Sequence, residues 1–375
     1  MKVIFCDNNL GGLLSFRRPV ISHFLFKGWE VVLLYPKTTK KETLISQIPL
    51  GCKVIETKMR PSGTSISQDL HFFKELYGIY RRERPDLVLH FTIKPNIFGT
   101  LAAKLSGIKY KVLMVAGLGY VFQGNSLAKR LGRILYKIAF KLTDRIITLN
   151  EANRDKLLTE GWVAPEKMIL FSGGEGVDLT TYPFRSNHFH QVRFLMVARL
   201  FYDKGYREFV GAARLVKAVY PEVQFDLLGA LDNTSPMSVP EEELNHDIAE
   251  GAINYLGEST DVPSIVGKDG VVVVVVSSYH EGMNRVLMEA CAMGRPVIAS
   301  NAPGCRELVD DSVNGYCIPP KNVKVLADAM LRFIALSEED KQAMGIAGYE
   351  KAKKQFDVNL VIKQYDDLLQ NLNIT

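Results

Sequence analysis

The chain has 375 residues, of which 47% are hydrophobic and 23% charged, and its formal net charge is +5. It is too long for one average hydrophobic core, so we expect two globular domains. The composition excludes a disordered or fibrous chain, no apolar run is long enough to span a membrane, and the mild positive charge gives nucleic-acid binding no support.

The five cysteines are scattered along the chain and include no C-x-x-C pair. We therefore predict small thiols in a reducing compartment, with no disulfide framework and no metal site. The N-terminal apolar run, which ends at Cys6, is too short for the core of a signal peptide and is typical of a first strand.

A strand–loop–helix–strand pattern opens the chain. Residues 3–6 and 31–35 are predicted strands, and Ser15 is predicted to cap the helix between them. Gly11 and Gly12 stand in the loop before that helix, where the absence of a Cβ lets backbone amides approach an anion. A plain tight turn is the alternative. Because the two glycines are not part of a G-x-G-x-x-G fingerprint, a dinucleotide site is not predicted.

Strands and helices continue to alternate through the first half. The predicted strands are 54–56, 86–90, 111–115 and 146–149, and the predicted helices are 68–82, 96–105, 126–144 and 150–160. His90 ends its strand and is the candidate acid/base of this half, although a hydrogen-bonded core histidine fits the pattern better. The helix at 126–144 carries five basic residues among apolar ones. We predict that it meets anionic lipid headgroups, with an ordinary surface helix as the alternative.

The second half follows a glycine-rich loop at 172–178 and a polar linker at 185–191, where a hinge would let two domains close on a ligand. Residues 194–198 are a predicted strand. Arg199 and Lys204 come next, beside the start of a predicted helix. A planar guanidinium and a compact ammonium in this position suit a diphosphate, and two solvated loop cations are the alternative.

Two glutamates mark the next candidate site. The surrounding predicted elements are strands at 223–228, 254–256, 271–276 and 297–300, a polar loop at 233–243, and helices at 283–293 and 358–372. Six consecutive valines make 271–276 a strand that is buried on both faces. Glu281 stands at the mouth of the following helix, which Gly294 is placed to cap, and Glu289 lies about two turns further along it.

Carboxylates at the start of a helix that follows a parallel strand are well placed to accept hydrogen bonds from sugar or ribose hydroxyls. The alternative is that Glu281 is an acid favoured by the helix dipole and that Glu289 is a solvated surface residue.

The segment around these two glutamates resembles the E-x7-E signature of the family 4 retaining glycosyltransferases, which have the GT-B fold. The residues that carry the resemblance are Ser278, Glu281, Gly282, Glu289, Ala290, Ala292, Gly294 and Pro296. Further matches are the R-L…K-G pattern at Arg199, Leu200, Lys204 and Gly205 and the P-G-x-x-E pattern that ends at Glu307. The resemblance extends over essentially the whole chain.

The resemblance implies two Rossmann-like, doubly wound α/β domains that face a central cleft. Residues 1–184 would form the acceptor-side domain, and residues 192–355 would form the domain that binds a nucleotide sugar. Residues 356–375 would be a helix that crosses back to the first domain.

The resemblance also assigns ligand contacts. Arg199 and Lys204 would neutralise the departing diphosphate, in place of a metal ion. Glu289 would bind the ribose hydroxyls, and Glu281 the hydroxyls of the donor sugar. The other residues that would contact the ligands are Gly282, Met283 and Asn284 on the donor side, and Gly11, Gly12 and His90 near the acceptor.

Many members of this family have a histidine in the loop after the strand at 111–115, whereas this chain has Ala116 and Gly117. In this the chain resembles bacterial N-acetylhexosaminyl transferases of surface-glycan pathways. That implies transfer of an N-acetylhexosamine such as GalNAc from a UDP-sugar to a polyprenyl-diphosphate-linked saccharide. A transferase of capsule or O-antigen that uses UDP-glucose or UDP-galactose is an alternative, and so is a GT-B UDP-sugar epimerase.

The same resemblance implies that the enzyme needs no cofactor or metal ion. It would bind no nucleic acid, and it would work in the cytoplasm in peripheral association with the cytoplasmic membrane.

Overall fold

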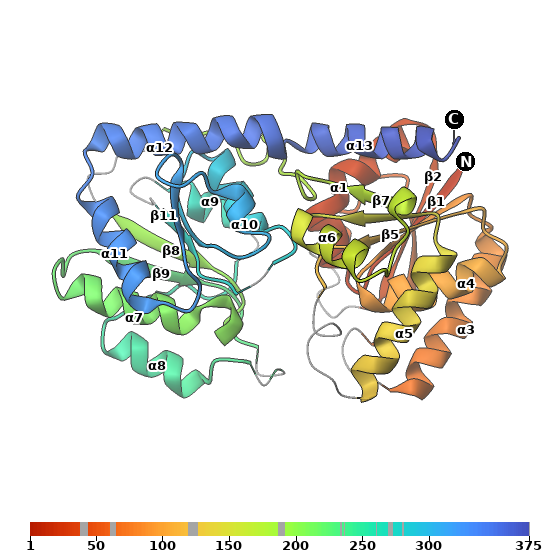
Figure 1. The fold of residues 1–375 in the computed structure, drawn as a ribbon, viewed down its shortest axis with the longest axis horizontal. Helices are drawn as coiled ribbons and strands as arrows, with labels where there is room; N and C mark the ends of the chain where they lie inside the picture. The colour runs from red at the N-terminus through yellow and green to blue at the C-terminus, as the bar shows by residue number, and fades with distance from the viewer. Residues whose placement is uncertain are drawn as a thin grey trace. The chain divides into compact units, whose positions relative to one another are not determined.

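The computed structural model describes residues 1–37, 44–60, 65–118, 127–186, 192–232, 235, 237–259, 261–268, 273–279 and 281–374. They fall into two compact units, Met1–Glu175 with Val358–Thr375, and Gly176–Asp357. Each unit is a parallel sheet with helices on both faces (Figure 1). The predicted α/β class with two doubly wound sheets is therefore confirmed. The roles predicted for 1–184, 192–355 and 356–375 stay predictions.

The first unit contains a parallel sheet with the strand order β3-β2-β1-β4-β5-β6-β7. Its strands are β1 (Lys2–Cys6), β2 (Glu30–Pro36), β3 (Lys53–Thr57), β4 (Leu87–Phe91), β5 (Tyr110–Val115), β6 (Arg145–Thr148) and β7 (Met168–Leu170). The central strands are continuous apolar runs because both faces of the sheet are covered. β7 was not predicted, since three residues are too few to show a period.

Helices cover both faces of this first sheet. They are α1 (Leu10–Phe26), α3 (Ile66–Glu83), α4 (Thr100–Leu105), α5 (Leu127–Leu142), α6 (Glu151–Thr159) and α13 (Val358–Asn371), with a π-helical turn at Pro95–Gly99 and a 3-10 turn at Pro165–Lys167. Figure 1 shows α3, α4 and α5 together on one side and α1 with α13 on the other.

Helix α1 begins earlier than the sequence pattern predicts. Its N-cap is Asn9, whose side chain accepts a hydrogen bond from the backbone amide of Gly12. Ser15 therefore lies inside the helix and not at its cap, and Gly11 and Gly12 form its first turn and not a loop. The prediction was wrong because asparagine caps helices at least as well as serine, and the two glycines hid the helical start.

The second unit contains a parallel sheet with the strand order β10-β9-β8-β11-β12-β13. Its strands are β8 (Arg193–Val197), β9 (Gln224–Leu228), β10 (Asn254–Tyr255), β11 (Val273–Val276), β12 (Val297–Ser300) and β13 (Gly315–Ile318). β11 is the described part of the predicted valine strand; residues 271 and 272 lie outside the described residues.

The helices of the second unit are α7 (Tyr206–Lys217), α8 (Glu241–Ala249), α9 (Val262–Val266), α10 (Arg285–Ala292), α11 (Val323–Ile334) and α12 (Glu338–Lys351), with short turns at Tyr202–Lys204, Arg306–Leu308 and Ala352–Phe356. Helices α7 and α11 pack on one face of the sheet and α10 and α12 on the other (Figure 1). Residues 241–243, predicted to be loop, instead begin α8, because three glutamates in its first turn are favoured by the helix dipole.

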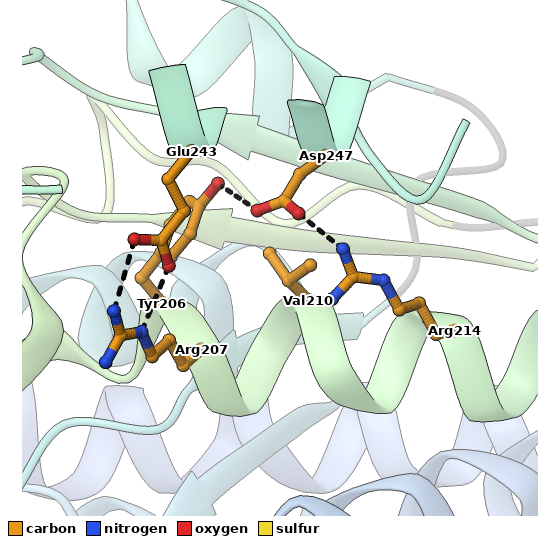
Figure 2. Close-up of a pocket in the computed structure, with 6 residues that line it drawn as sticks. All are labelled: Tyr206, Arg207, Val210, Arg214, Glu243 and Asp247. Carbon is orange, nitrogen blue, oxygen red and sulfur yellow. Dashed lines mark hydrogen bonds and ion pairs between the residues drawn. The ribbon is translucent and has the colours of Figure 1, made fainter. Parts of the chain in front are cut away.

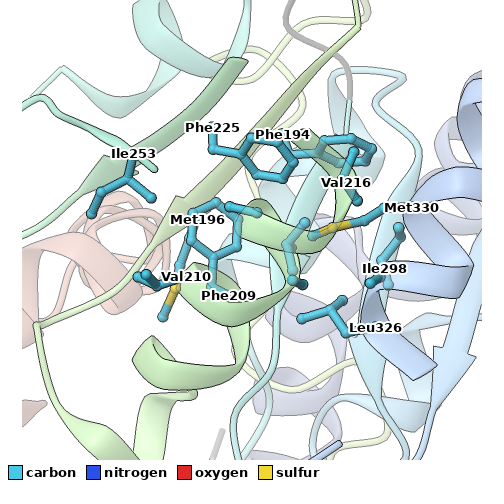
Figure 3. Packing of buried hydrophobic residues seen from close by; sticks show 14 of the residues in the cluster. Phe194, Met196, Phe209, Val210, Val216, Phe225, Ile253, Ile298, Leu326 and Met330 are labelled. Carbon is cyan, nitrogen blue, oxygen red and sulfur yellow. The ribbon is translucent and has the colours of Figure 1, made fainter. Parts of the chain in front are cut away.

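The core of the second unit lies between its sheet and the α7–α11 layer. Phe194 and Phe225 stack with ring centroids 5.2 Å apart, and Phe209 from α7 meets Phe225 edge-on at 5.9 Å (Figure 3). Each buried side chain of this size contributes roughly 1.5–3 kcal/mol by leaving water. This packing fixes the ends of β8 and α7, between which Arg199 and Lys204 lie.

Among the helices of the described residues, none is both long and apolar enough to cross a membrane.

Candidate functional site

The predicted donor-site residues gather at one edge of the second sheet. Strands β8 and β11 are neighbours, but β8 leads through α7 to β9 on one side and β11 leads through α10 to β12 on the other. Ligands of open α/β sheets bind outside the carboxyl ends of the strands at such a switch point. The segments that follow these two strands carry Arg199, Lys204 and Glu281.

Lys204 and Glu281 form an ion pair at this edge. Lys204 Nζ lies 2.7 Å from Glu281 Oε1, and the hydroxyl of Ser278 donates to the same oxygen at 2.7 Å. The two charged side chains are 21% and 18% exposed. An ammonium that is half-shielded from water and held by a single carboxylate is well placed to bind a competing anion such as a diphosphate.

Hydrogen bonds to backbone carbonyls join the segment that follows β11 to the segment that follows β8. The amide of Tyr279 donates to the carbonyl of Asp203 at 3.0 Å, and the Ser277 hydroxyl donates to the carbonyl of Gly205 at 3.0 Å. Gly205 has φ +85°, and a Cβ added there would lie 2.2 Å from Ser277 Oγ. Only glycine suits this position, so the K-G pair of the sequence pattern sets how closely Lys204 approaches the 277–281 segment.

The segment that carries Glu281, Gly282, Met283 and Asn284 leads into α10. The Asn284 side chain caps the helix by accepting from the amide of Leu287 at 3.0 Å. Backbone N–H groups at such a helix start favour negative charge. The structure places Glu281 of this segment beside Lys204, and the ligand contacts of all four residues stay predictions.

A turn that contains Gly304 packs against the segment that carries Glu281 and Asn284. The amide of Glu281 donates to the carbonyl of Pro303 at 3.0 Å, and the amide of Asn284 donates to the carbonyl of Gly304 at 2.7 Å. Gly304 has φ +82°, and a Cβ there would lie 2.7 Å from the backbone of Glu281 and Gly282. The P-G-x-x-E pattern therefore shapes the loop that holds Glu281, a role that sequence reasoning did not assign.

Glu289 lies in α10 and is not a solvated surface residue. It is 4% exposed, and its Oε1 lies 2.6 Å from Arg285 Nε one helical turn earlier. Tyr182 interacts with both side chains. Burial raises the pKa of its hydroxyl, and the Glu289 carboxylate raises that pKa further. Sequence reasoning missed Arg285 and Tyr182, although the i, i+4 spacing of Arg285 and Glu289 was a signal for the first.

Arg199 follows β8 and is exposed. Its guanidinium carbon lies 4.5 Å from the centroid of the Phe201 ring, so the cation is oriented by an aromatic face. Within the described residues no ion pair of Arg199 occurs. Two cations of different character, Arg199 and Lys204, thus follow the same strand.

His90 does not form part of a site in the first unit. It is fully buried, Tyr80 Oη lies 2.8 Å from its Nε2, and Thr100 Oγ1 lies 3.2 Å from its Nδ1. Burial, together with the charge of Lys111, lowers the pKa of His90 to about 3. Gly99 packs so closely that an added Cβ would lie 2.6 Å from the ring. A neutral, enclosed imidazole argues against the acid/base role and for the alternative of a core histidine.

Gly11 and Gly12 lie after β1, and β1 and β4 are the neighbours at the switch point of the first sheet. The Gly12 amide donates to the side-chain oxygen of the capping Asn9, and a Cβ added to Gly11 would lie 3.3 Å from that oxygen. Their predicted ligand contact stays a prediction. In the loop after β5, Ala116 and Gly117 are described, whereas residues 119–126 lie outside the described residues.

A separate groove of about 250 Å³ lies between α7 and α8 (Figure 2). Its charged groups are paired with one another: Arg214 lies 2.5 Å from Asp247, Arg207 lies 3.0 Å from Glu243, and the Tyr206 hydroxyl donates to Asp247 at 2.6 Å. This arrangement holds α8 against α7. It includes neither Lys204 nor Glu281.

Across the described part of the chain, no group of three or more His, Cys, Asp or Glu side chains is placed to hold a metal ion.

Comparisons with known families match both units. Residues 182–351 match the family described as glycosyl transferases group 1, and residues 13–150 match the family described as glycosyl transferase 4-like. The first match contains Arg199, Lys204, Glu281 and Glu289, and the second contains most of α1 and all of β4.

Two relatives indicate the kind of chemistry that similar chains perform. An N,N'-diacetylbacillosaminyl-diphospho-undecaprenol alpha-1,3-N-acetylgalactosaminyltransferase of Campylobacter jejuni is 27% identical over 99% of this chain and 100% of its own. A UDP-Gal:alpha-D-GlcNAc-diphosphoundecaprenol alpha-1,3-galactosyltransferase of Escherichia coli is 26% identical over 72% of this chain and 71% of its own.

Solved structures show the same fold. Anabaena HepE in complex with UDP and glucose has a TM-score of 0.79 at 20% identity, and each chain is covered to 99%. Sucrose-phosphate synthase from Thermosynechococcus elongatus has a TM-score of 0.80 at 17% identity, again with 99% of each chain covered.

Proposed function

Since this chain belongs to the glycosyltransferases of the GT-B fold, with a group 1 domain after a 4-like domain, we propose that it transfers an N-acetylhexosamine from a UDP-sugar to a polyprenyl-diphosphate-linked saccharide. The relative that matches over its full length carries GalNAc to such an acceptor, which favours UDP-GalNAc as donor. The observation that carries the proposal is the Lys204–Glu281 pair at the switch point.

The leaving group explains why cations stand at this edge. When the bond between the anomeric carbon and the diphosphate oxygen breaks, negative charge grows on the diphosphate. Lys204 and Arg199 lie after the same strand and would stabilise that charge, as would the N–H groups at the start of α10. These groups would take the place of a metal ion, so no metal or other cofactor is needed.

Attack on the same face of the sugar accounts for the chemistry without a protein nucleophile. The acceptor hydroxyl forms the new bond to the anomeric carbon as the diphosphate departs, and its proton passes to the departing phosphate oxygen. The α-linked products named for both relatives fit this outcome, because the UDP donors of galactose and GalNAc are themselves α-linked. His90 is not required in this scheme.

The two glutamates have distinct roles in the proposal. Glu281, next to Lys204, accepts hydrogen bonds from hydroxyls of the donor sugar once the Lys204 ammonium has bound the diphosphate. Glu289, buried against Arg285, accepts from the ribose hydroxyls. A donor of glucose or galactose would use the same groups, and the galactosyltransferase of E. coli makes UDP-galactose the second candidate.

Thermal unfolding tests nucleotide recognition. At a hundredfold excess over Kd, UDP should stabilise the donor-binding unit by about 2.7 kcal/mol and raise its Tm by roughly 5 °C. The shift should persist in EDTA and should exceed the shifts given by GDP, ADP and NAD. UDP-GalNAc, UDP-galactose and UDP-glucose tested side by side select the donor. A shift with NAD alone, or with no nucleotide, would contradict the proposal.

An exposed apolar stripe on α5 supports association with the cytoplasmic membrane, where a polyprenyl acceptor resides. Leu131, Ile134 and Ile138 are 46%, 56% and 41% exposed, and their spacing puts them on one stripe of the helix. The exposed Arg130, Lys137 and Lys141 run along one side of that stripe. Apolar residues beside cations favour an anionic lipid surface.

Vesicle co-sedimentation measures this association. The double variant Ile134→Asp, Ile138→Asp should bind vesicles rich in anionic lipid roughly tenfold more weakly, because it removes apolar contact and adds like charge to the lipid. The matched control is Leu215→Asp on α7, a side chain that is 46% exposed in the other unit. Equal vesicle binding by the double variant and the wild type would exclude α5 as the lipid contact.

A further inference from the structure

Three buried charged side chains meet where the chain leaves the first unit. Arg17 of α1 lies between Asp7, just after β1, and Glu175, the last residue of the unit before the chain crosses. Arg17 NH1 is 2.8 Å from Asp7 Oδ2, and Arg17 Nε is 2.7 Å from Glu175 Oε1. The residues are 4%, 1% and 7% exposed. None of them takes part in the donor-site chemistry described above.

The same guanidinium reaches the switch point of the first sheet. Arg17 NH1 also donates to the carbonyl of Gly12 at 3.3 Å, and the guanidinium carbon lies 3.7 Å from the centroid of the Phe91 ring at the end of β4. Asp7 Oδ1 in turn accepts from the amide of Asn8 at 2.5 Å. Arg17 and Asp7 thus shape the turn formed by residues 8–12, which lies between β1 and the body of α1.

The cluster also holds the crossing segment, residues 174–176, where the chain leaves the first unit. Glu175 stands between Gly174 and Gly176, whose φ values are +64° and +73°. The chain returns to the first unit at Val358 and enters α13. Tyr365 of that helix meets Phe171, four residues before Glu175, edge-on with ring centroids 5.2 Å apart. Burial raises the pKa of the Tyr365 hydroxyl, and the Glu175 carboxylate raises that pKa further. Helix α13, which follows the return passage, therefore lies close to the segment that ends at Glu175.

Stability alone does not account for this cluster. It contains one cation and two carboxylates, and buried ion pairs can often be replaced by apolar side chains without loss of stability. A guanidinium, however, binds several partners at once in fixed directions, which a lysine ammonium on a flexible stem does not do. The arrangement therefore fixes the position of the crossing segment relative to the turn of residues 8–12.

We propose that Arg17 is a positioning residue that couples the crossing segment at Glu175 to the turn of residues 8–12, which on the function proposed above faces the saccharide acceptor. A change in the contacts of Glu175 then alters the turn of residues 8–12 through the Arg17 guanidinium. Binding of the acceptor at the turn alters the crossing segment by the same route.

Hydrogen exchange tests the coupling without any assay of transfer. Glu175→Gln keeps the shape of the side chain, removes its charge and leaves the Asp7–Arg17 pair intact. The amides of residues 8–12 should exchange at least about threefold faster in this variant, because the guanidinium loses one of its fixed partners. The control is Glu83→Gln, which removes the charge of another buried carboxylate in the same unit. Glu83 pairs with Lys53 Nζ at 2.6 Å, and Lys53 begins β3, at the end of the sheet opposite the turn of residues 8–12. Unchanged exchange in the turn of Glu175→Gln would overturn the coupling.

Kinetics test what the coupling does. In Glu175→Gln, kcat/KM for the acceptor should fall roughly tenfold, while KM for the donor and the Kd for UDP stay within about twofold, because the donor residues lie in the other unit. Arg17→Lys should give a similar selective loss, and Glu175→Asp, which keeps the charge, should recover part of it.

Equal losses for acceptor and donor, or acceptor kinetics like those of the wild type, would overturn the positioning role. A wild-type chain that transfers no sugar would refute the proposed function but would leave the exchange result standing.

Discussion

Replacing Lys204 by methionine is expected to lower kcat by about 10²–10³-fold, the usual effect of removing one preorganised group that stabilises transition-state charge. The ammonium lies 2.7 Å from Glu281 at the switch point of the second sheet, so contacts within the protein itself hold the cation in place. Methionine preserves most of the stem and removes only the charge. Steady-state kinetics with saturating donor and acceptor measure the change.

The control for this prediction is Lys217→Met at the other end of α7. Lys217 Nζ donates to the carbonyl of Gly251 and lies away from the switch point. That variant should keep kcat within about twofold of the wild type, as expected for a substitution far from the chemistry. If Lys204→Met kept a comparable kcat, the diphosphate would have to be stabilised elsewhere.

Replacing Glu289 by alanine is expected to destabilise the second unit by about 3 kcal/mol and to abolish most of the donor affinity. The loss of stability follows from Arg285, which would be left as a half-buried guanidinium without the carboxylate 2.6 Å away. The loss of affinity follows from the ribose hydroxyls, which would lose their acceptor. Urea unfolding and UDP calorimetry measure the two effects separately.

The isosteric Glu289→Gln separates packing from recognition. It keeps a hydrogen-bonding oxygen, so it should lose less stability than the alanine variant and still bind UDP at least about tenfold more weakly. Glu350→Ala serves as a control, because that exposed carboxylate pairs with Lys353 on the surface and should change stability by at most about 0.5 kcal/mol. Wild-type UDP affinity in Glu289→Gln would contradict the ribose contact.

Much of the donor edge was predictable because local patterns determine it. Consecutive valines require a strand that is buried on both faces, and Gly294 with φ +70° ends α10 as its position after the apolar run predicts. Arg199, Lys204 and Glu281 each follow a predicted strand, and carboxyl ends of parallel strands meet at one edge. Their positions after these strands predicted a shared edge, and the family resemblance assigned their roles; the structure pairs Lys204 with Glu281 there.

The remaining features depend on contacts that no local pattern contains. The Arg17–Glu175 pair joins residues from opposite ends of the first unit, and nothing near Arg17 in the sequence distinguishes it from the exposed Arg18. His90 was an acid/base candidate because it ends a predicted strand, and the pattern could only favour the core alternative; the contacts that enclose it, Tyr80 and Thr100, come from two other elements. The role of Gly304 likewise appears only when its backbone is seen against that of Glu281.

The most direct test of sugar transfer is an assay with UDP-GalNAc and a synthetic polyprenyl-diphosphate saccharide, in which the product is isolated and its new linkage is determined by NMR. We predict release of UDP together with an α-linked GalNAc on the acceptor, in the presence of EDTA. A β-linked product would contradict attack on the same face. Failure to transfer sugar from any UDP-donor to any lipid-linked saccharide, by a chain that binds UDP, would contradict the proposed function itself.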